Sequence, residues 1–235
     1  MQLFYNPDID KDTQQITFDK VESRHIVKVL RKKEGDAIYI TNGKGLLFTS
    51  KINIASDKKC LVSIFKTEEK PIPRNYRVHI AIAPTKNNER LEWFLEKATE
   101  IGIDEITPII TQNSERKVIK KERLEKIIQA AMKQSLKFHL PILNDAVPFN
   151  KFLNQRLDKN IYIAHCHDDE KKSIKELIEP NESITILIGP EGDFSKEEVS
   201  TSVNANCKPI SLGEARLRTE TAALVAVQNV AFINQ

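Results

Sequence analysis

The sequence predicts an α/β domain built on a parallel sheet, preceded by a small β-rich domain. In the second part of the chain, strands that are apolar throughout alternate with helical patterns, which is typical of a parallel sheet covered on both faces. The first part contains short β-rich segments and an Asn-Gly turn signal, which favour a small barrel. We expect domains at residues 1–70 and 77–235, joined by a linker at 71–76 within a stretch rich in proline and charge.

The composition is that of a soluble globular protein, since 40% of the 235 residues are hydrophobic and 29% are charged. The 36 basic and 33 acidic side chains give a net charge of only +3. This balance argues against non-specific coating of nucleic acid, although a local basic patch could bind phosphates. The three cysteines form no CxxC pair, which argues against disulfides and structural zinc and favours a reducing cytoplasm. No secretory leader and no apolar run of about 18 residues is found, so we predict no membrane span.

In the N-terminal part, β-branched and aromatic residues predict strands at QQITF, DAIYIT, LLFTSKINI and CLVSIF, with TNGKG as a hairpin turn. The stretch VESRHIVKVLRKKEGD predicts a helix in which Val21, Ile26, Val29 and Leu30 share one face. Basic residues crowd the rest of this helix. They form either a solvated charged face or a surface that contacts phosphates, and the sequence leaves both readings open.

The second part begins with the apolar strand RVHIAIAP and continues with strands at EITPIIT, NIYIAH, SITILIGP and KPISLG. Apolar residues at helical spacing predict helices after the first and second strands, KEEVSTSVNAN lies between the last two, and a final helix begins near Thr219. The first helix carries the stripe Leu91, Phe94, Leu95, Ala98 and Ile101, and the second carries Leu124, Ile127, Ile128, Ala131, Ser135 and Phe138.

Three of these strands end in turns that favour a ligand site. The turns begin at His165, at Gly189 and at Leu212, and three of the seven glycines (189, 192 and 213) follow strands here. Glycine lets a ligand approach the main chain closely, and ligands of parallel sheets bind beyond the carboxyl ends of the strands. The alternative for GPEGD is a well-capped loop between a strand and a helix.

The acidic residues that follow narrow the choice of ligand. Neither GxGxxG nor GxxxxGK[ST] occurs, so no dinucleotide fingerprint or P-loop is predicted. Ser195 and Glu198 form a capping box, and Glu197 and Glu198 would repel a phosphate at this helix start. A neutral or cationic nucleoside-like ligand is therefore favoured.

A dense polar cluster precedes the last helix. It contains Glu214, Arg216, Arg218 and Glu220, and six apolar residues, 222–227, follow it. A helix that is apolar on every side must be buried, so these charges are held against a core or a subunit interface.

The stretches LIGPEGDFSKEEV and LGEARLRTETAALVAV together closely resemble the signature of the ribosomal RNA small subunit methyltransferase E family, of the SPOUT class. HIVKVLRKKEGD is similar to the PUA-like N-terminal domain of that family, and KNNERLEWFLEKATEIGIDEITPIIT is similar to the start of its catalytic domain. Two departures are visible. Asp193 replaces a usual glycine, which we expect to be a neutral change at a loop edge. KQSLK, with Lys133 and Lys137, replaces a Glu-Gln-Ser-x-Arg-like stretch and weakens any role carried over to residue 133.

The resemblance implies methylation of uridine N3 in bacterial 16S ribosomal RNA, S-adenosylmethionine as cofactor, a C-terminal trefoil knot and a homodimer. No metal is expected, because His165, Cys166 and His167 are too few ligands for a metal site. The residues that the resemblance assigns to the cofactor are His165 at its edge, Ile188, Gly189, Pro190, Glu191, Gly192, Ser211, Leu212, Gly213, Leu217, Arg218, Thr219, Thr221 and Ala222.

For catalysis we expect Arg218 to stabilise the developing negative oxygen of uracil, and Glu220 or a water molecule to take the N3 proton. The alternative for Glu220 is a salt bridge with a neighbouring arginine. The RNA, expected within an assembled 30S particle, would contact Arg24, His25, Lys28, Arg31, Arg116 and Lys117. The alternative functions are a related methyltransferase that acts on a transfer RNA base or a ribose 2′-hydroxyl, and a non-catalytic RNA-binding module.

Overall fold

The computed structural model of the protein describes residues 1–155 and 160–235. The chain forms two compact units, one of residues 1–73 with 132–140 and one of residues 74–131 with 141–235. The segment 132–140 is held in the first unit by backbone hydrogen bonds from Gly45 N to Phe138 O (2.9 Å) and from Leu140 N to Gly43 O (2.9 Å). The division expected from the sequence kept this segment with the second domain.

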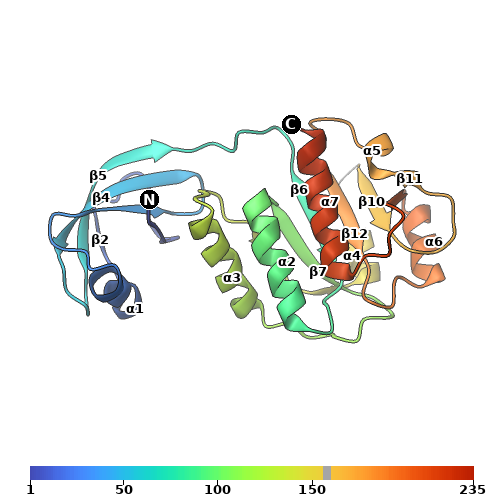
Figure 1. Cartoon of the computed structure of the whole chain (residues 1–235), viewed down its shortest axis with the longest axis horizontal. Helices are drawn as coiled ribbons and strands as arrows, with labels where there is room; N and C mark the ends of the chain where they lie inside the picture. The colour runs from blue at the N-terminus through green and yellow to red at the C-terminus, as the bar shows by residue number, and fades with distance from the viewer. Residues whose placement is uncertain (156–159) are drawn as a thin grey trace. The chain divides into compact units, whose positions relative to one another are not determined.

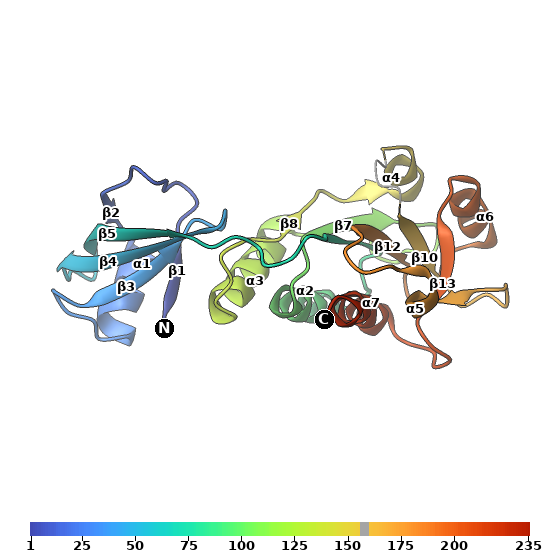
Figure 2. The ribbon, with the colours of Figure 1, turned by 90° about the horizontal axis from the view of Figure 1, so that it is seen from above.

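The first unit is a curled five-stranded sheet in the order β1 (Leu3–Tyr5), β3 (Ala37–Thr41), β4 (Leu46–Ile54), β5 (Leu61–Glu69) and β2 (Gln15–Thr17) (Figure 2). Four of these strands follow the predicted segments, and the Asn42-Gly43 turn joins β3 to β4 with Gly43 at φ 70°. Phe4, Ile40 and Phe48 are buried in its core. No pairing joins the edge strands β1 and β2 within the described residues, so the predicted barrel is an open half-barrel.

The basic helix of this unit differs from the prediction. Helix α1 (Lys20–Arg24), capped by Asp19, continues directly into a π-helical turn, η1 (His25–Val29), in which Leu30 N donates to His25 O (2.9 Å). Ile26 is fully buried, but Val21 is 77% and Val29 is 67% exposed. The predicted shared apolar face is therefore wrong, because the wider i→i+5 turn changes the angular spacing on which the stripe was based.

The second unit is built on a parallel sheet in the order β11 (Lys172–Ser173), β13 (Lys208–Ser211), β10 (Ile161–Ala164), β12 (Ile184–Ile188), β6 (Val78–Ile82), β7 (Glu105–Ile110) and β8 (Ile142–Leu143) (Figure 1). The short strand β9 (Val147–Pro148) also pairs with β7. The five apolar strands of the prediction are confirmed. They are apolar throughout because helices cover both faces of the sheet.

Helices α2 (Asn88–Ile101) and α7 (Thr219–Ile233) lie side by side on one face of the sheet, whereas α4 (Phe149–Gln155) and α6 (Lys196–Asn204) lie on the other (Figure 2). The short helix α5 (Ile174–Leu177) contacts α7. Helix α3 (Lys121–Gln134) ends before Ser135 and Phe138, which were predicted to continue its stripe. Leu136, at φ 54°, has a left-handed backbone conformation that a helix does not continue through.

The path of the C-terminal segment brings distant residues together. From β13, which pairs with β10 and β11, the chain returns across the sheet so that α7 packs on β6 and β12. Residues 212–218 make this crossing next to the carboxyl ends of the strands, where the resemblance expects the knot. Among the helices of the described residues, none has the length and apolar character that crossing a membrane requires.

Candidate functional site

Loops that follow β6, β7 and β12 are fastened to one another at the carboxyl edge of the sheet. Asn113, after β7, donates from Nδ2 to Gly192 O (3.1 Å) and to Asp193 O (3.0 Å). Lys86 N, after β6, donates to Oε1 of Glu191 (3.0 Å). These bonds hold the GPEGD turn from two sides.

Arg116, predicted to contact RNA, is half-buried and binds its own chain. Its Nε donates to Thr85 O (3.2 Å) and one terminal nitrogen donates to Lys86 O (2.7 Å). The neighbouring Lys117 is exposed. The Arg116 guanidinium thus braces the loop after β6, and the sequence pattern contained no signal for this role.

Two different physical reasons explain why glycine occupies positions 189, 192 and 213. A side chain at Gly189 would meet the ring (3.0 Å) and backbone nitrogen (3.1 Å) of Phe194, and one at Gly192 would meet Asn113 Cβ (3.3 Å). Packing within the protein therefore accounts for both. Gly213 instead has φ 127° and open space beside it, which suits a turn that a ligand approaches.

Asp193 links the turn after β12 to the turn after β10. Its φ is 63°, and its carboxylate accepts hydrogen bonds from Cys166 N (2.7 Å) and Phe194 N (2.8 Å). The position expected to be a neutral loop edge is thus an anchor between two of the three predicted site turns.

His165, at the end of β10, is only 7% exposed, and neither ring nitrogen has a hydrogen-bond partner among the described residues. Burial, followed by the nearby Lys171 ammonium, lowers the pKa of this imidazole below 6.5. Lys171 Nζ also donates to His165 O (3.0 Å). The ring is therefore held neutral with one donor and one acceptor unused.

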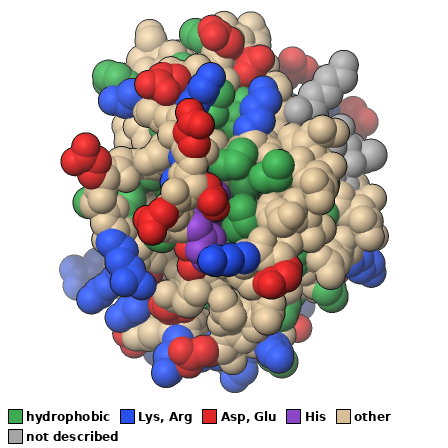
Figure 3. Space-filling model, turned by 90° about the vertical axis from the view of Figure 1, so that its right-hand side faces the viewer, with side chains coloured by type: hydrophobic (Ala, Val, Ile, Leu, Met, Phe, Trp, Pro, Cys, Tyr) green, Lys and Arg blue, Asp and Glu red, His purple; other side chains and the backbone are tan. Residues whose placement is uncertain are grey.

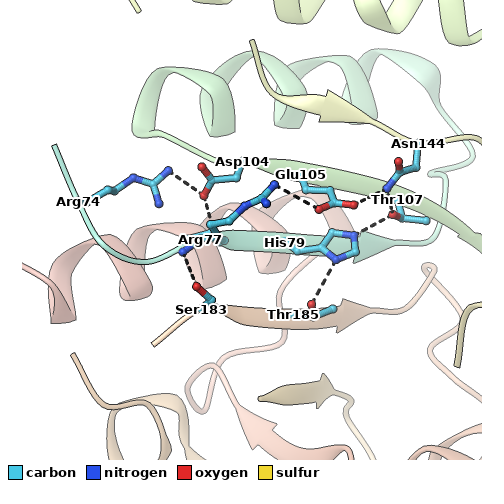
Figure 4. Close-up of polar contacts among 10 residues, drawn as sticks. Arg74, Arg77, His79, Asp104, Glu105, Thr107, Asn144, Ser183 and Thr185 are labelled. Atoms are coloured by element: carbon cyan, nitrogen blue, oxygen red, sulfur yellow. Dashed lines mark hydrogen bonds and ion pairs between the residues drawn. The ribbon is translucent and has the colours of Figure 1, made fainter. Parts of the chain in front are cut away.

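A second histidine shows the opposite arrangement. On the sheet itself, His79 bonds through Nε2 to Thr107 Oγ1 (2.8 Å) and through Nδ1 to Thr185 Oγ1 (3.2 Å) (Figure 4). Asn144 Nδ2 extends this network to Thr107 Oγ1 (2.7 Å) and Glu105 Oε1 (2.7 Å). The network joins β12, β6 and β7 and needs no ligand to satisfy it.

Arg90 of α2, which the sequence prediction did not select, joins two predicted site residues. Its guanidinium lies 4.0 Å from Glu191 Oε1 and 3.8 Å from Glu220 Oε1. Glu220 is buried, and its Oε2 has no partner among the described residues. The salt bridge with an arginine, the alternative considered for Glu220, is therefore present at Oε1, whereas Oε2 is buried without a hydrogen bond among the described residues.

Arg218 is exposed at the N-cap of α7, and its guanidinium has no partner in the described part of the chain. Within the described part of the chain, residues 214–217 also make no hydrogen bond that would hold the crossing segment. Of the remaining predicted cofactor residues, Ile188, Pro190 and Thr219 are buried, and Ser211, Leu212, Leu217, Thr221 and Ala222 are half-buried.

These residues fit the expected sulfonium nucleoside. The crossing segment offers free backbone groups for neutral polar atoms, and Glu191 and Glu220 supply negative charge for a cationic centre. Among the described residues, no cluster of histidine, cysteine and acidic side chains could hold a metal ion.

In the first unit, Arg24, Lys28 and Arg31 are exposed and His25 is half-buried. Lys28 Nζ lies 3.9 Å from Asp57, and His25 Nδ1 lies 3.6 Å from Glu22. Such loose pairs leave the basic side chains available to phosphates.

Comparisons with known proteins identify the family of the chain. Residues 72–231 match the model of an RNA methyltransferase domain, and residues 18–65 match that of an RNA methyltransferase PUA domain. The ribosomal RNA small subunit methyltransferase E of Buchnera aphidicola subsp. Acyrthosiphon pisum is 34% identical, over 93% of this chain and 88% of its own.

Two solved structures extend the similarity. A probable rRNA-methyltransferase from Porphyromonas gingivalis is 41% identical, with a TM-score of 0.93 over 100% of this chain and 98% of its own. A Legionella pneumophila protein assigned as a methyltransferase, solved with bound SAM, is 28% identical, with a TM-score of 0.89 over 99% and 97%. The expected fold, a PUA-like sheet followed by a SPOUT-type parallel sheet, is confirmed.

Proposed function

Because the chain belongs to the ribosomal RNA small subunit methyltransferase E family, we propose that it transfers a methyl group from S-adenosylmethionine to N3 of one uridine in 16S ribosomal RNA. The relatives carry the small-subunit RNA in their name. The observation that supports the N3 chemistry is Oε2 of Glu220, which is buried without a partner among the described residues, two positions after the exposed Arg218 at the start of α7.

The cofactor is proposed to lie among the turns at 188–192, 211–213 and 217–222, with the backbone of His165 at its edge. When bound, S-adenosylmethionine supplies a methyl group on a positive sulfonium. Glu191 and Glu220 favour that charge electrostatically, and Arg90 holds both carboxylates in place. The open backbone next to Gly213 leaves room for the nucleoside part.

Uridine N3 becomes a nucleophile when it loses its proton, and the negative charge then spreads onto the uracil oxygens. Glu220 Oε2 is proposed to accept this proton directly or through water. Arg218 is proposed to face the oxygen, and the positive end of the helix α7 dipole assists it. N3 is occupied in a base pair, so the uridine must be unpaired or flipped out.

We assign contacts with the RNA phosphates to Arg24, His25, Lys28 and Arg31 in the first unit, and to Lys117 and Arg116 in the second. A homodimer is proposed because apolar side chains remain exposed on the paired helices, with Trp93 on α2 at 42% and Phe232 on α7 at 62%. The assembled 30S particle is the proposed substrate.

The test is mass mapping of 16S ribosomal RNA from cells that lack this gene. One small-subunit uridine should lack a methyl group, and purified protein with S-adenosylmethionine should restore it on isolated 30S particles. Restoration on a transfer RNA or on a ribose hydroxyl would contradict the proposed acceptor. Absence of heat on titration with S-adenosylmethionine and with its demethylated product would instead favour a non-catalytic RNA-binding module.

A further inference from the structure

A groove of about 660 Å³ runs along helix α6, on the face of the sheet opposite α2 and α7. The turn after β10 lines one side with His165 and Asp168, and α6 and β13 line the other with Lys196, Val199, Val203 and Pro209. Figure 3 shows this end of the second unit, where histidine lies in a hollow bordered by basic, acidic and apolar side chains. None of the α6 residues belongs to the proposed cofactor site.

The imidazole of His165 faces this groove. Ile161 and Ile163 pack with Phe194 and Val199 on the α6 side of the sheet, and side chains alternate along a strand, so His165 continues the same side. It is more than nine-tenths buried, with both ring nitrogens unpartnered among the described residues. His79, by comparison, bonds through both nitrogens, so the unsatisfied ring nitrogens of His165 have no explanation among the described residues.

The side chains that line the groove favour an uncharged, ring-shaped ligand. Asp168 and Asp169 line the groove together with Lys196, so its formal charge does not favour a phosphate. Val199, Val203 and Pro209 provide an apolar wall for a flat face, and the buried imidazole of His165 beside them keeps one donor and one acceptor unused. A nucleobase has this combination of face and edge.

The groove also lies close to the proposed reaction site. Cys166, directly after His165, donates its backbone N–H to Asp193 of the turn after β12 (2.7 Å). His167 Nε2 in turn bonds to Phe194 O (2.8 Å). The groove and the proposed cofactor site are therefore built on the same turn after β10.

We propose that the α6 groove binds an unpaired nucleobase of the RNA that neighbours the methylated uridine, with the His165 ring bonded to its edge and Val199 and Val203 against its face. This inference rests on the proposed RNA methyltransferase function and adds a second base-recognition site to it.

The test fills the groove from α6. Ser200 lines the groove and Thr201, the next exposed residue, does not, so Ser200→Trp and Thr201→Trp form a matched pair. We expect Ser200→Trp to raise the KM for 30S particles about tenfold, as expected for about one lost base contact. Its kcat and its calorimetric affinity for S-adenosylmethionine should stay within about twofold of Thr201→Trp.

Equal KM values for the two variants, or a weaker cofactor affinity in Ser200→Trp alone, would overturn the proposal. A measurement on the unaltered protein keeps it testable if Ser200→Trp does not fold. Small-subunit RNA carrying 4-thiouridine beside the target should crosslink to peptides containing 165–169 or 196–204. Crosslinks confined to other peptides would reject base binding in the groove. Failure of the protein to methylate 30S particles would instead reject the proposed function, and the crosslinks would still report whether RNA enters the groove.

Discussion

The two units present charge in different ways. In the first, Arg24 of α1 and Lys28 of η1 stand exposed, as does Arg31 just after η1, and the nearest acid to Lys28 lies 3.9 Å away. In the second, Asn113 donates two hydrogen bonds to the turn after β12, and the Asp193 carboxylate accepts one from the turn after β10 and one within its own turn. Mobile surface charges attract RNA with an affinity that salt weakens, whereas fixed polar groups hold reacting atoms in place. The contrast predicts different responses to substitution.

The largest effect is expected at the free guanidinium of the second unit. Arg218→Ala should lower kcat about 100- to 1000-fold, because a positioned donor to a developing negative charge is lost. The melting temperature should not change, since Arg218 has no partner among the described residues. Single-turnover methylation of 30S particles measures the rate. Arg216→Ala, an exposed arginine two residues earlier, is the control, and a similar loss there would assign the effect to bulk charge.

The next effect concerns the first unit. Replacing Arg24, Lys28 and Arg31 together by alanine should weaken RNA binding at low salt and reduce the slope of log K against log salt by about 2, because three phosphate contacts disappear. The chemical rate at saturating RNA should be unchanged. The triple change of Lys51, Lys58 and Lys59, exposed in the same unit, removes the same charge elsewhere. If that triple variant lowers the slope equally, Arg24, Lys28 and Arg31 have no special role.

Arg90→Met tests whether fixed charges in the second unit depend on one another. Loss of Arg90 leaves Glu220 buried without its ion-pair partner, and we expect the free energy of unfolding to fall by about 1–2 kcal/mol. Glu220→Gln removes the charge and should recover most of this loss in the double variant. Urea unfolding of the four proteins of the cycle measures the coupling, and additive changes would contradict it.

Asp193 tests the connection between two loops. Asp193→Gly removes both carboxylate bonds, to Cys166 N and Phe194 N, and should weaken S-adenosylmethionine binding about tenfold, a loss of about 1.4 kcal/mol. Asn can keep an accepting oxygen and tolerates a positive φ. The affinity of Asp193→Asn for S-adenosylmethionine should therefore lie between those of the unaltered protein and Asp193→Gly. Calorimetry measures both, and an unchanged affinity in Asp193→Gly would make the residue a neutral loop edge as expected from the sequence.

The elements that the sequence predicted correctly are those that depend on local apolar patterns. Strands such as Ile184–Ile188 and the α2 stripe followed from unbroken or helical apolar spacing, which depends on neighbouring residues only. The π-helical turn at His25–Val29 was missed because its hydrogen-bond pattern has no periodic signature. The attachment of residues 132–140 to the first unit depends on bonds to Gly43 and Gly45, far away along the chain.

The sequence predicted the turns that form the candidate site but not the side-chain contacts that join them. The glycine-containing ends of β12 and β13 were visible as motifs. Arg90 was not, because its partners Glu191 and Glu220 lie about 100 and 130 residues away in the printed sequence and pair only after the sheet has formed. Asp193 was underestimated for the same reason, since Cys166 belongs to another strand's turn.

The smallest expected effect is a pH dependence confined to the second unit. Burial lowers the pKa of His165 below 6.5, so below about pH 6.5 the unfolded chain binds a proton that the folded chain resists. This contribution to stability is complete above pH 6.5 and is lost as the pH falls toward the folded pKa. In urea unfolding at pH 7.5 and 5.5, His165→Gln should therefore lose less stability on acidification than the unaltered protein. Equal losses would mean that this ring takes up its proton as easily in the folded protein as in the unfolded chain.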